Sequence, residues 1–236
     1  MPFGRKRRLD RSVRERGVAP EVEDRHIDDE REPTTGPFDV EDAAEDDLER
    51  VDFGAMLIPK TAGSDLRVGL DAKGRVISVS VVREDSVMQI GAYAAPRGEP
   101  IWPGLRPELA KSIRSQGGRA TEAEGQFGID LTAELAPPRT GSKDSGKAAR
   151  RPARFIGVDG PRWFVRAVVT GPAATDKDAA AELLETLREV IVVRGTDPRP
   201  VREALPLKLP PDMAEQLGQQ VDSDAEAPPS LPSFTI

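Results

Sequence analysis

The segment that most resembles a reaction centre is Gly141–Ala148, GSKDSGKA. It fits the phosphate-binding pattern G-x-x-x-x-G-K up to its last position, where Ala148 replaces the Ser or Thr that would hold Mg²⁺. A phosphate loop also needs a buried strand before it and a helix after it. Here LAPPRT precedes the segment, and Pro152 disfavours a helix soon after it. We therefore interpret this segment as a loop without a nucleotide site.

The chain has few residues that are suited to other kinds of catalysis. There is no cysteine, which excludes disulfides, thiolate-ligated zinc, iron–sulfur clusters and thiol nucleophiles. The single histidine, His26, lies in an acidic segment, so a positioned imidazole is not expected. The acidic runs lack the calcium-loop pattern, and no G-x-G-x-x-G follows a strand. We therefore predict no catalytic residue, no metal and no cofactor, and an enzyme is the least favoured functional class.

Basic residues interleaved with aromatic ones form the remaining pattern with a chemical meaning. Residues 139–166 carry eight basic and two acidic residues, and Phe155, Trp163 and Phe164 lie among them. Such a surface can contact phosphates and stack on bases. The alternative explanation is a solvated loop beside core aromatics. If the segment binds a polyanion, the candidate residues are Arg150, Arg151, Arg154, Arg162 and Arg166.

The charges of the chain divide into three segments. Residues 1–50 carry 10 basic and 16 acidic side chains, residues 51–210 carry 24 and 20, and residues 211–236 carry none and 5. Their low apolar content predicts that 1–50 is a disordered tail, basic and then acidic, and that 211–236 is a disordered acidic tail. The basic start of the first tail suits solvation, contact with nucleic acid or an acidic partner, or an anionic membrane surface. One folded domain is expected over 51–210.

The sequence also predicts where in the cell the protein is located. No stretch reaches 18 apolar residues, so no membrane span is expected. No apolar segment follows the basic start, so no secretory signal is expected either. We predict a cytoplasmic protein.

Alternating apolar residues predict antiparallel strands in the middle of the chain. A hairpin over 155–169 turns at Asp159–Pro161, and its second strand places Trp163, Val165, Ala167 and Val169 on one face. The same alternation puts Arg162, Phe164, Arg166 and Val168 on the other face, where the guanidinium groups would be exposed. The abundance of aromatics predicts that this hairpin is the centre of the sheet. Further strands are expected at 66–70, 75–82, 86–95, 119–125 and 127–135. In the last of them Ile129, Leu131, Ala133 and Leu135 face one way, and Asp130, Thr132 and Glu134 face the other.

Two helices are predicted between and after these strands. The first follows Pro103, with Trp102 as a core anchor ahead of it, and ends at Gly117–Gly118. The second is capped by Asp176 or Asp178. Residues 190–193 are either its last turn or a short closing strand, and 196–210 are expected to pack as an extended cover. The predicted fold class is α+β, an antiparallel sheet with two packed helices.

Several blocks of the sequence resemble one family. They are GPFDVEDA at 36–43, AAPR before Ile101–Trp102, RPARFIGVDGPRWFVRAVVTGPAA at 151–174, and VIVVRG at 190–195 followed by LPLKLP. These blocks resemble the actinobacterial domain-of-unknown-function family thirty-seven-ten over residues 36–210, and RPARF…GPRWF is the most specific. The resemblance implies no catalytic residues. The order of elements is also similar to Mog1/PsbP-like α+β sandwiches, an analogy of fold that implies no activity.

Two functional hypotheses follow from these observations. The first is a non-catalytic macromolecular interaction domain with an unknown protein partner. The second is a nucleic-acid-associated protein that uses the basic segment 139–166.

Overall fold

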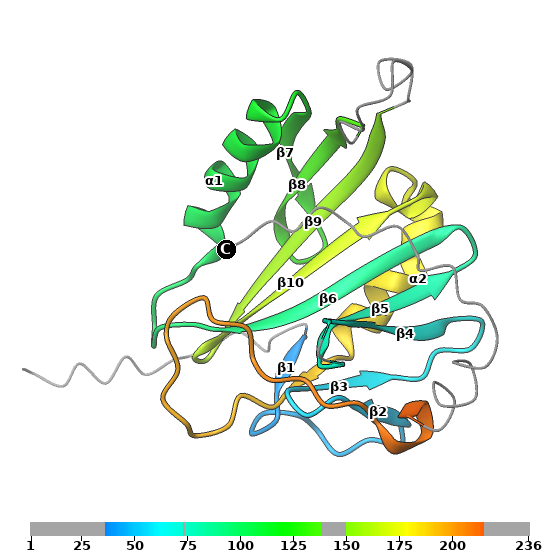
Figure 1. Ribbon diagram of the computed structural model, residues 1–236, viewed down its shortest axis with the longest axis vertical. Helices are drawn as coiled ribbons and strands as arrows, with labels where there is room; N and C mark the ends of the chain where they lie inside the picture. Colours follow the sequence, from blue (N-terminus) through cyan, green and yellow to red (C-terminus); the bar gives the residue numbers. More distant parts are fainter. Residues whose placement is uncertain (1–35, 73, 138–149, 215–236) are drawn as a thin grey trace, which may run out of the picture. The chain divides into compact units, whose positions relative to one another are not determined.

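A seven-stranded antiparallel sheet forms the main layer of the protein (Figure 1). This computed structural model describes residues 36–72, 74–137 and 150–214, all within one compact unit. The strand order is β4-β5-β6-β10-β9-β8-β7. The bounds are β4 Asp65–Leu70, β5 Val76–Arg83, β6 Ser86–Ala94, β7 Arg119–Gly125, β8 Gly128–Leu135, β9 Arg151–Gly160 and β10 Trp163–Thr170. Because β10 is the middle strand, the predicted position of the hairpin at the centre of the sheet is confirmed.

A second, smaller sheet was not predicted from the sequence. Its order is β1-β11-β3-β2, with β1 Phe38–Asp39, β11 Ile191–Val192, β3 Met56–Pro59 and β2 Arg50–Asp52. β1 pairs parallel with β11, and the other pairs are antiparallel. The strand β11 decides between the two readings of residues 190–193, which form a short strand rather than the last turn of a helix.

The two predicted helices are present. Helix α1 spans Trp102–Ser115 and α2 spans Lys177–Arg188. Asp176 is the N-cap of α2, because its carboxylate accepts hydrogen bonds from the N–H groups of Asp178 and Ala179. After α1 the chain turns through Gly117 at φ 86°, a left-handed conformation that favours glycine. The predicted α+β class, antiparallel strands with two packed helices, is confirmed.

Both faces of the central hairpin are buried in separate apolar cores. The larger core contains Trp163, Val165, Ala167 and Val169 of β10 together with α2 and the smaller sheet. The second core lies under α1 and contains Phe155, Phe164 and Val168. The predicted solvent exposure of the face of Arg162, Phe164, Arg166 and Val168 is therefore corrected for Phe164 and Val168, which are buried, whereas the two arginines are half-buried. Helix α1 covers that face, and Phe164 is fully buried beneath it.

The predicted start of the folded domain at residue 51 falls inside the observed domain. Strand β1 pairs with β11, and the N–H of Phe38 donates to the carbonyl of Val190 at 2.9 Å. The buried carboxylate of Asp39 accepts a 2.7 Å hydrogen bond from Trp163 Nε1. Composition could not reveal this, because the acidic residues of 36–50 resemble a solvated tail while Asp39 is held by a partner far along the chain.

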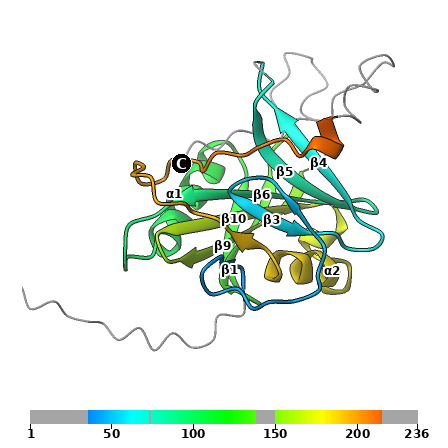
Figure 2. The ribbon, with the colours of Figure 1, turned by 90° about the horizontal axis from the view of Figure 1, so that it is seen from below.

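The chain after β11 forms the predicted extended cover. Ala204 bridges Tyr93, Leu207 bridges Gly54, and Leu205 is buried. Figure 2 shows this extension (orange) running from the α1 end of the domain to the β4 end. Residues 211–214 form a helical turn with Met213 against the larger core, so the predicted tail does not begin at 211. The other tail predictions, and the loop 141–148, lie outside the described residues.

The burial of Trp163 generates a first prediction. Trp163→Ala is expected to lower the free energy of unfolding by ~3–5 kcal/mol, as for other large buried aromatics. Trp163→Phe keeps most of the apolar area but leaves Asp39 without the indole donor, at a cost of ~1–3 kcal/mol. Urea denaturation followed by circular dichroism measures both. An unchanged midpoint for Trp163→Ala would contradict the assignment of this face to the core.

The N-terminal segment generates a second prediction. A chain beginning at residue 34 is expected to melt like the full chain, whereas one beginning at residue 51 loses β1 and the acceptor of Trp163. A buried donor without a partner costs ~1–3 kcal/mol, so the shorter chain is expected to melt at a lower temperature. Differential scanning calorimetry compares the two. Equal melting temperatures would show that 36–50 contributes nothing to folding.

Candidate anion-binding site

The five predicted polyanion-binding arginines do not share one surface. Arg150 and Arg151 are exposed at the start of β9, whereas Arg162 lies in the turn after its end. A strand of this length places the two ends about 30 Å apart at about 3.3 Å per residue. The structure therefore brings no continuous track of these side chains together.

Arg154 is engaged inside the domain. Its Nη2 lies 2.6 Å and its Nε 2.7 Å from Asp130 Oδ2, and Asp130 is only 2% exposed. Burial raises the pKa of Asp130, and the hydrogen bond from Arg154 opposes that rise. The predicted alternation of β8 is confirmed for Leu131, Ala133 and Leu135, which are buried, but it is wrong at the start of the strand, where Asp130 is buried and Ile129 is 41% exposed. The alternation of β8 alone could not show that Arg154, opposite Thr132 on the next strand, provides a partner for the acid.

Arg166 lies over an aromatic ring on the α1 side of the sheet. Its guanidinium carbon is 5.4 Å from the centroid of the Tyr93 ring, a cation–π distance. Tyr93 in turn contacts Phe164, whose ring also stacks on Trp102. Arg166 therefore covers the edge of the core beneath α1.

Arg162 occupies the turn between β9 and β10 in an unusual backbone conformation. Its φ is +64°, and Pro161 precedes it, which is the arrangement of a type II turn. Glycine or asparagine is favoured at that position, because other side chains are strained there. The Arg162 carbonyl accepts hydrogen bonds from the N–H of Ala95 at 3.0 Å and from Arg194 Nε at 3.2 Å. No carboxylate in the described part of the chain pairs with its guanidinium.

Arg194 approaches Arg162 from the loop after β11, and Arg199 of the same loop is near enough to Arg194 for their charges to repel. Arg194 donates from Nη1 to the carbonyls of Gly195 and Asp197 at 3.1 and 2.7 Å, in addition to its bond with Arg162. Burial lowers the pKa of Arg194, and the positive charges of Arg162 and Arg199 lower it further, while Asp197 acts in the opposite direction. We call Arg162, Arg194 and Arg199 the arginine cluster.

The sequence analysis found Arg162 but missed the other two members. Arg194 and Arg199 are more than thirty residues further along the chain and are joined to Arg162 only by folding. The sequence feature that could have indicated this site is Arg194 followed by Gly195, at the end of VIVVRG. Gly195 has a φ of +70°, a conformation that favours glycine in a turn.

The geometry of the arginine cluster suits binding of an anion. The positive charges of Arg162 and Arg199 each repel that of Arg194, and among the described residues the one acid in a salt bridge with a member is Glu203, 3.4 Å from Arg199. A guanidinium presents a planar set of donors that matches the oxygens of carboxylate and phosphate. Across residues 36–72, 74–137 and 150–214, no group of three or more His, Cys, Asp or Glu is placed to hold a metal ion. The cluster can therefore bind an oxyanion by charge and hydrogen bonds.

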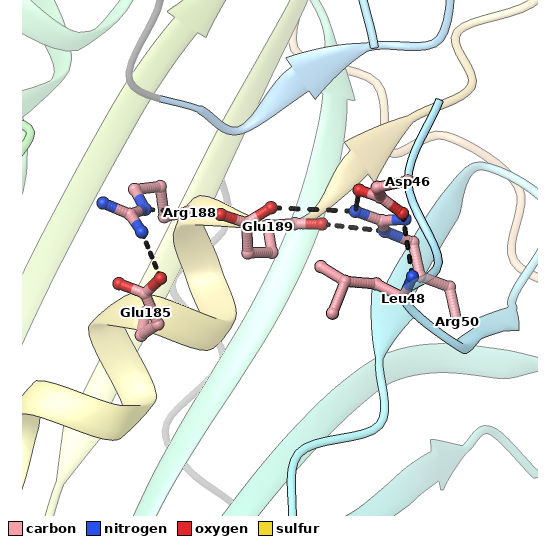
Figure 3. Close-up of polar contacts among 6 residues, drawn as sticks. All are labelled: Asp46, Leu48, Arg50, Glu185, Arg188 and Glu189. Carbon is pink, nitrogen blue, oxygen red and sulfur yellow. Dashed lines mark hydrogen bonds and ion pairs between the residues drawn. The ribbon is translucent and has the colours of Figure 1, made fainter. Parts of the chain in front are cut away.

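The members of a second charged cluster are paired with one another (Figure 3). Arg50 Nη1 and Nη2 lie 2.6 and 2.7 Å from the two oxygens of Asp46, and Arg50 Nε donates to the carbonyl of Glu189 at 3.1 Å. The hydrogen bond from Arg50 lowers the pKa of Asp46. Arg188 pairs with both Glu185 and Glu189. This cluster fastens the segment before β2 to the C-terminal end of α2, where a cation is favourable, and its charges are satisfied.

Asp159 positions α1 against the end of β9. Ile101 is the N-cap of α1 and has no side-chain acceptor. Asp159 supplies one from the neighbouring strand, accepting from the N–H of Ile101 at 2.7 Å and from the N–H of Trp102 at 3.1 Å. Burial raises the pKa of Asp159, while these two bonds oppose the rise. The carboxylate therefore replaces the missing cap of the helix.

Comparison with known families identifies the chain. The family described as "Protein of unknown function (DUF3710)" matches residues 36–216. This chain belongs to that family. The match begins at Gly36, the first described residue, which agrees with the inclusion of β1 in the domain of this DUF3710 protein. The resemblance seen in the sequence is thereby confirmed at the level of the family.

Comparisons with curated proteins and solved structures add little about function. No curated protein matches the chain. The solution structure of cyanobacterial PsbP (CyanoP) from Synechocystis sp. PCC 6803 is similar at 13% sequence identity, with a TM-score of 0.33, over 61% of this chain and 92% of that chain. At that TM-score the similarity carries no argument, and the α+β class follows from the strands and helices of the DUF3710 domain itself. No helix within the described ranges is long and apolar enough to cross a membrane.

The cap of α1 generates a third prediction. Asp159→Ala is expected to lower the free energy of unfolding by ~0.5–2 kcal/mol, the cost of losing a cap. Asp159→Asn keeps an oxygen acceptor and should lose less. Because the pKa of Asp159 is raised in the folded state, the folded protein binds this proton more tightly than the unfolded chain. Its contribution to stability therefore falls as pH rises from the unfolded value through the folded value.

The measurement is urea denaturation of the three proteins at several pH values. The difference between wild type and Asp159→Asn should change across that pH interval. Asp159→Ala and Asp159→Asn of equal stability would show that the carboxylate does not act as a cap.

Proposed function

We propose that this DUF3710 protein is a non-catalytic macromolecular interaction domain that binds an acidic protein partner through the arginine cluster. We include a cytoplasmic location in an actinobacterium in the proposal. The location is supported by a sequence without cysteine, which suits a reducing compartment, and the host by the family resemblance of the sequence blocks.

The observation that supports the proposal is the conformation of Arg162. A residue other than glycine in the left-handed region costs on the order of 1 kcal/mol or more, and such strain tends to occur at functional sites. The side chain held there is half-buried, positively charged and without a carboxylate partner among the described residues. Stability alone would favour glycine at this turn. A partner that supplies the missing negative charge accounts for the arginine.

Nucleic acid is the second candidate partner, and the structure bears on how it would bind. The sequence pattern combined basic residues with Phe155, Trp163 and Phe164, and all three side chains are fully buried in the two cores. They are not accessible for stacking on bases. Arg139, Lys143 and Lys147 lie outside the described residues. Binding by the described arginines would therefore rest on phosphate contacts, which depend steeply on salt and little on sequence.

A matched pair of variants tests the proposed function. Arg162→Gly removes the charge and relieves the backbone strain. Arg202→Gly is the control, because Arg202 also has a positive φ, of +68°, but its guanidinium is paired with Glu108 at 3.0 Å. The tagged full-length proteins are captured from native cells, with and without nuclease, and the retained proteins are quantified by mass spectrometry.

We expect a partner that survives nuclease treatment, is lost at least five-fold in Arg162→Gly and is kept in Arg202→Gly. The same partners on wild type and Arg162→Gly would place the interaction elsewhere on the molecule. Loss of every Arg162-dependent partner on nuclease treatment would instead favour the nucleic-acid hypothesis.

A further inference from the structure

We propose that the arginine cluster is a binding site for a single phosphoryl group. The inference rests on the proposed function for the location of the site, and it adds the chemistry of the ligand. A phosphate monoester is nearly dianionic at neutral pH and offers three strong acceptor oxygens. The source of the group is either a phosphorylated side chain of the partner or a free phosphate compound, and both present the same chemistry.

The hydrogen bonds of Arg194 define one side of the site. A guanidinium has five N–H donors. Nε donates to the carbonyl of Arg162, and Nη1 donates to the carbonyls of Gly195 and Asp197. No described residue accepts from Nη2. The three bonds hold the plane of the guanidinium in place, so that the two N–H groups of Nη2 are oriented before a ligand arrives and little conformational entropy is lost on binding.

Arg162 supplies a second guanidinium, whose positive charge is near enough to act on Arg194. Its carbonyl is the acceptor for Arg194, so the two residues are joined at 3.2 Å through the backbone of the turn. The left-handed conformation of Arg162 is itself held by Pro161 before it and by the bond from the N–H of Ala95 to its carbonyl. The backbone of Arg162 is therefore held by the hairpin, by the end of β6 and by Arg194 of the loop.

The charge balance favours a dianion over a single carboxylate. Arg162 and Arg194 have no carboxylate within salt-bridge distance among the described residues. Arg199 forms a salt bridge with Glu203 at 3.4 Å. The negative charge of Asp197 partly offsets the repulsion that the other arginines exert on Arg194. A carboxylate would offset one of the two uncompensated charges, whereas a phosphoryl group would offset both. The N–H groups of Arg194 Nη2 and the guanidinium of Arg162 can each donate to the oxygens of such an oxyanion.

The rest of the basic surface favours a compact ligand over a polymer. Arg154 is paired with Asp130, Arg166 covers Tyr93, and Arg151 lies at the far end of β9. A nucleic acid strand binds best along a continuous positive groove with accessible aromatics, and neither is formed by the described residues. The cluster is one site at one end of the sheet.

The strain at Arg162 leads to a test in which stability and binding change in opposite directions. Arg162→Gly is expected to melt at a higher temperature than wild type in chloride buffer, because glycine adopts this conformation freely. The probe is inorganic phosphate at pH 7.5, compared with chloride at equal ionic strength, and both melting temperature and calorimetric titration are recorded on the full-length protein. A ligand that binds only the folded state raises its melting temperature, and the rise grows with the logarithm of the ligand concentration once that concentration exceeds Kd.

Wild type and Arg202→Gly are expected to bind phosphate with equal affinity, and Arg162→Gly is expected to bind at least ten-fold more weakly. Arg162→Lys, which keeps the charge and the strain but loses the fork, should be intermediate. Absence of a phosphate-specific shift in wild type overturns the inference. So does a shift of the same size in Arg162→Gly, which would place phosphate elsewhere.

A phosphatase arm identifies the source of the phosphoryl group. If treating the native extract with phosphatase removes the Arg162-dependent partner, the group is carried by that partner. If the partner persists while phosphate still binds at Arg162, the ligand is a free phosphate compound. Failure of phosphate binding together with an Arg162-dependent partner would overturn this inference and leave the proposed interaction domain intact.

Discussion

Two indole rings lie on opposite faces of β9, each seated on a glycine of that strand. A Cβ at Gly157 would come within 2.2 Å of the Trp102 ring, and a Cβ at Gly160 within 2.2 Å of the Trp163 ring. Because glycine has no side chain, each of the two indole rings can pack directly against the backbone of β9. Trp163 belongs to the larger core and Trp102 to the core under α1. Trp102 donates from Nε1 to the carbonyl of Ile129 at 2.7 Å, and Trp163 donates to Asp39. Helix α1, β8 and the N-terminal segment are therefore all joined to one hairpin.

The same hairpin holds the candidate site. The turn that follows Gly160 carries Arg162, and its carbonyl joins the end of β6 to the loop after β11. The extension that begins in this loop returns to β6 through the N–H of Arg202 and the carbonyl of Ala94, 2.8 Å apart. A strained residue can persist at this turn because packing on both faces of the sheet fixes the backbone on either side of it.

Most of the large sheet and both helices were predictable because their signals are local. Alternation along β5, β6, β8 and β10 and the apolar stripe of α2 need only a few neighbouring residues. The smaller sheet was not predictable in this way. Its strands are two to four residues long, too short for a period, and β1 lies in an acidic segment. Asp39 and Asp130 were assigned to solvent, since a buried acid is recognised only when its distant partner is known.

The sequence by itself determined the class of fold, the central hairpin and the lack of cysteine and of a well-placed histidine, because these follow from composition and from periodicity within a single segment. It also pointed to Arg162 among the basic residues. Only the tertiary structure decided which arginines act together. Arg154 is neutralised by an acid on the adjacent strand, whereas Arg162 is joined by Arg194 from a distant loop, and Arg199 lies near Arg194. The physical reason is that the energy of a charge depends on distance and burial, and both are set by contacts between residues far apart in the chain.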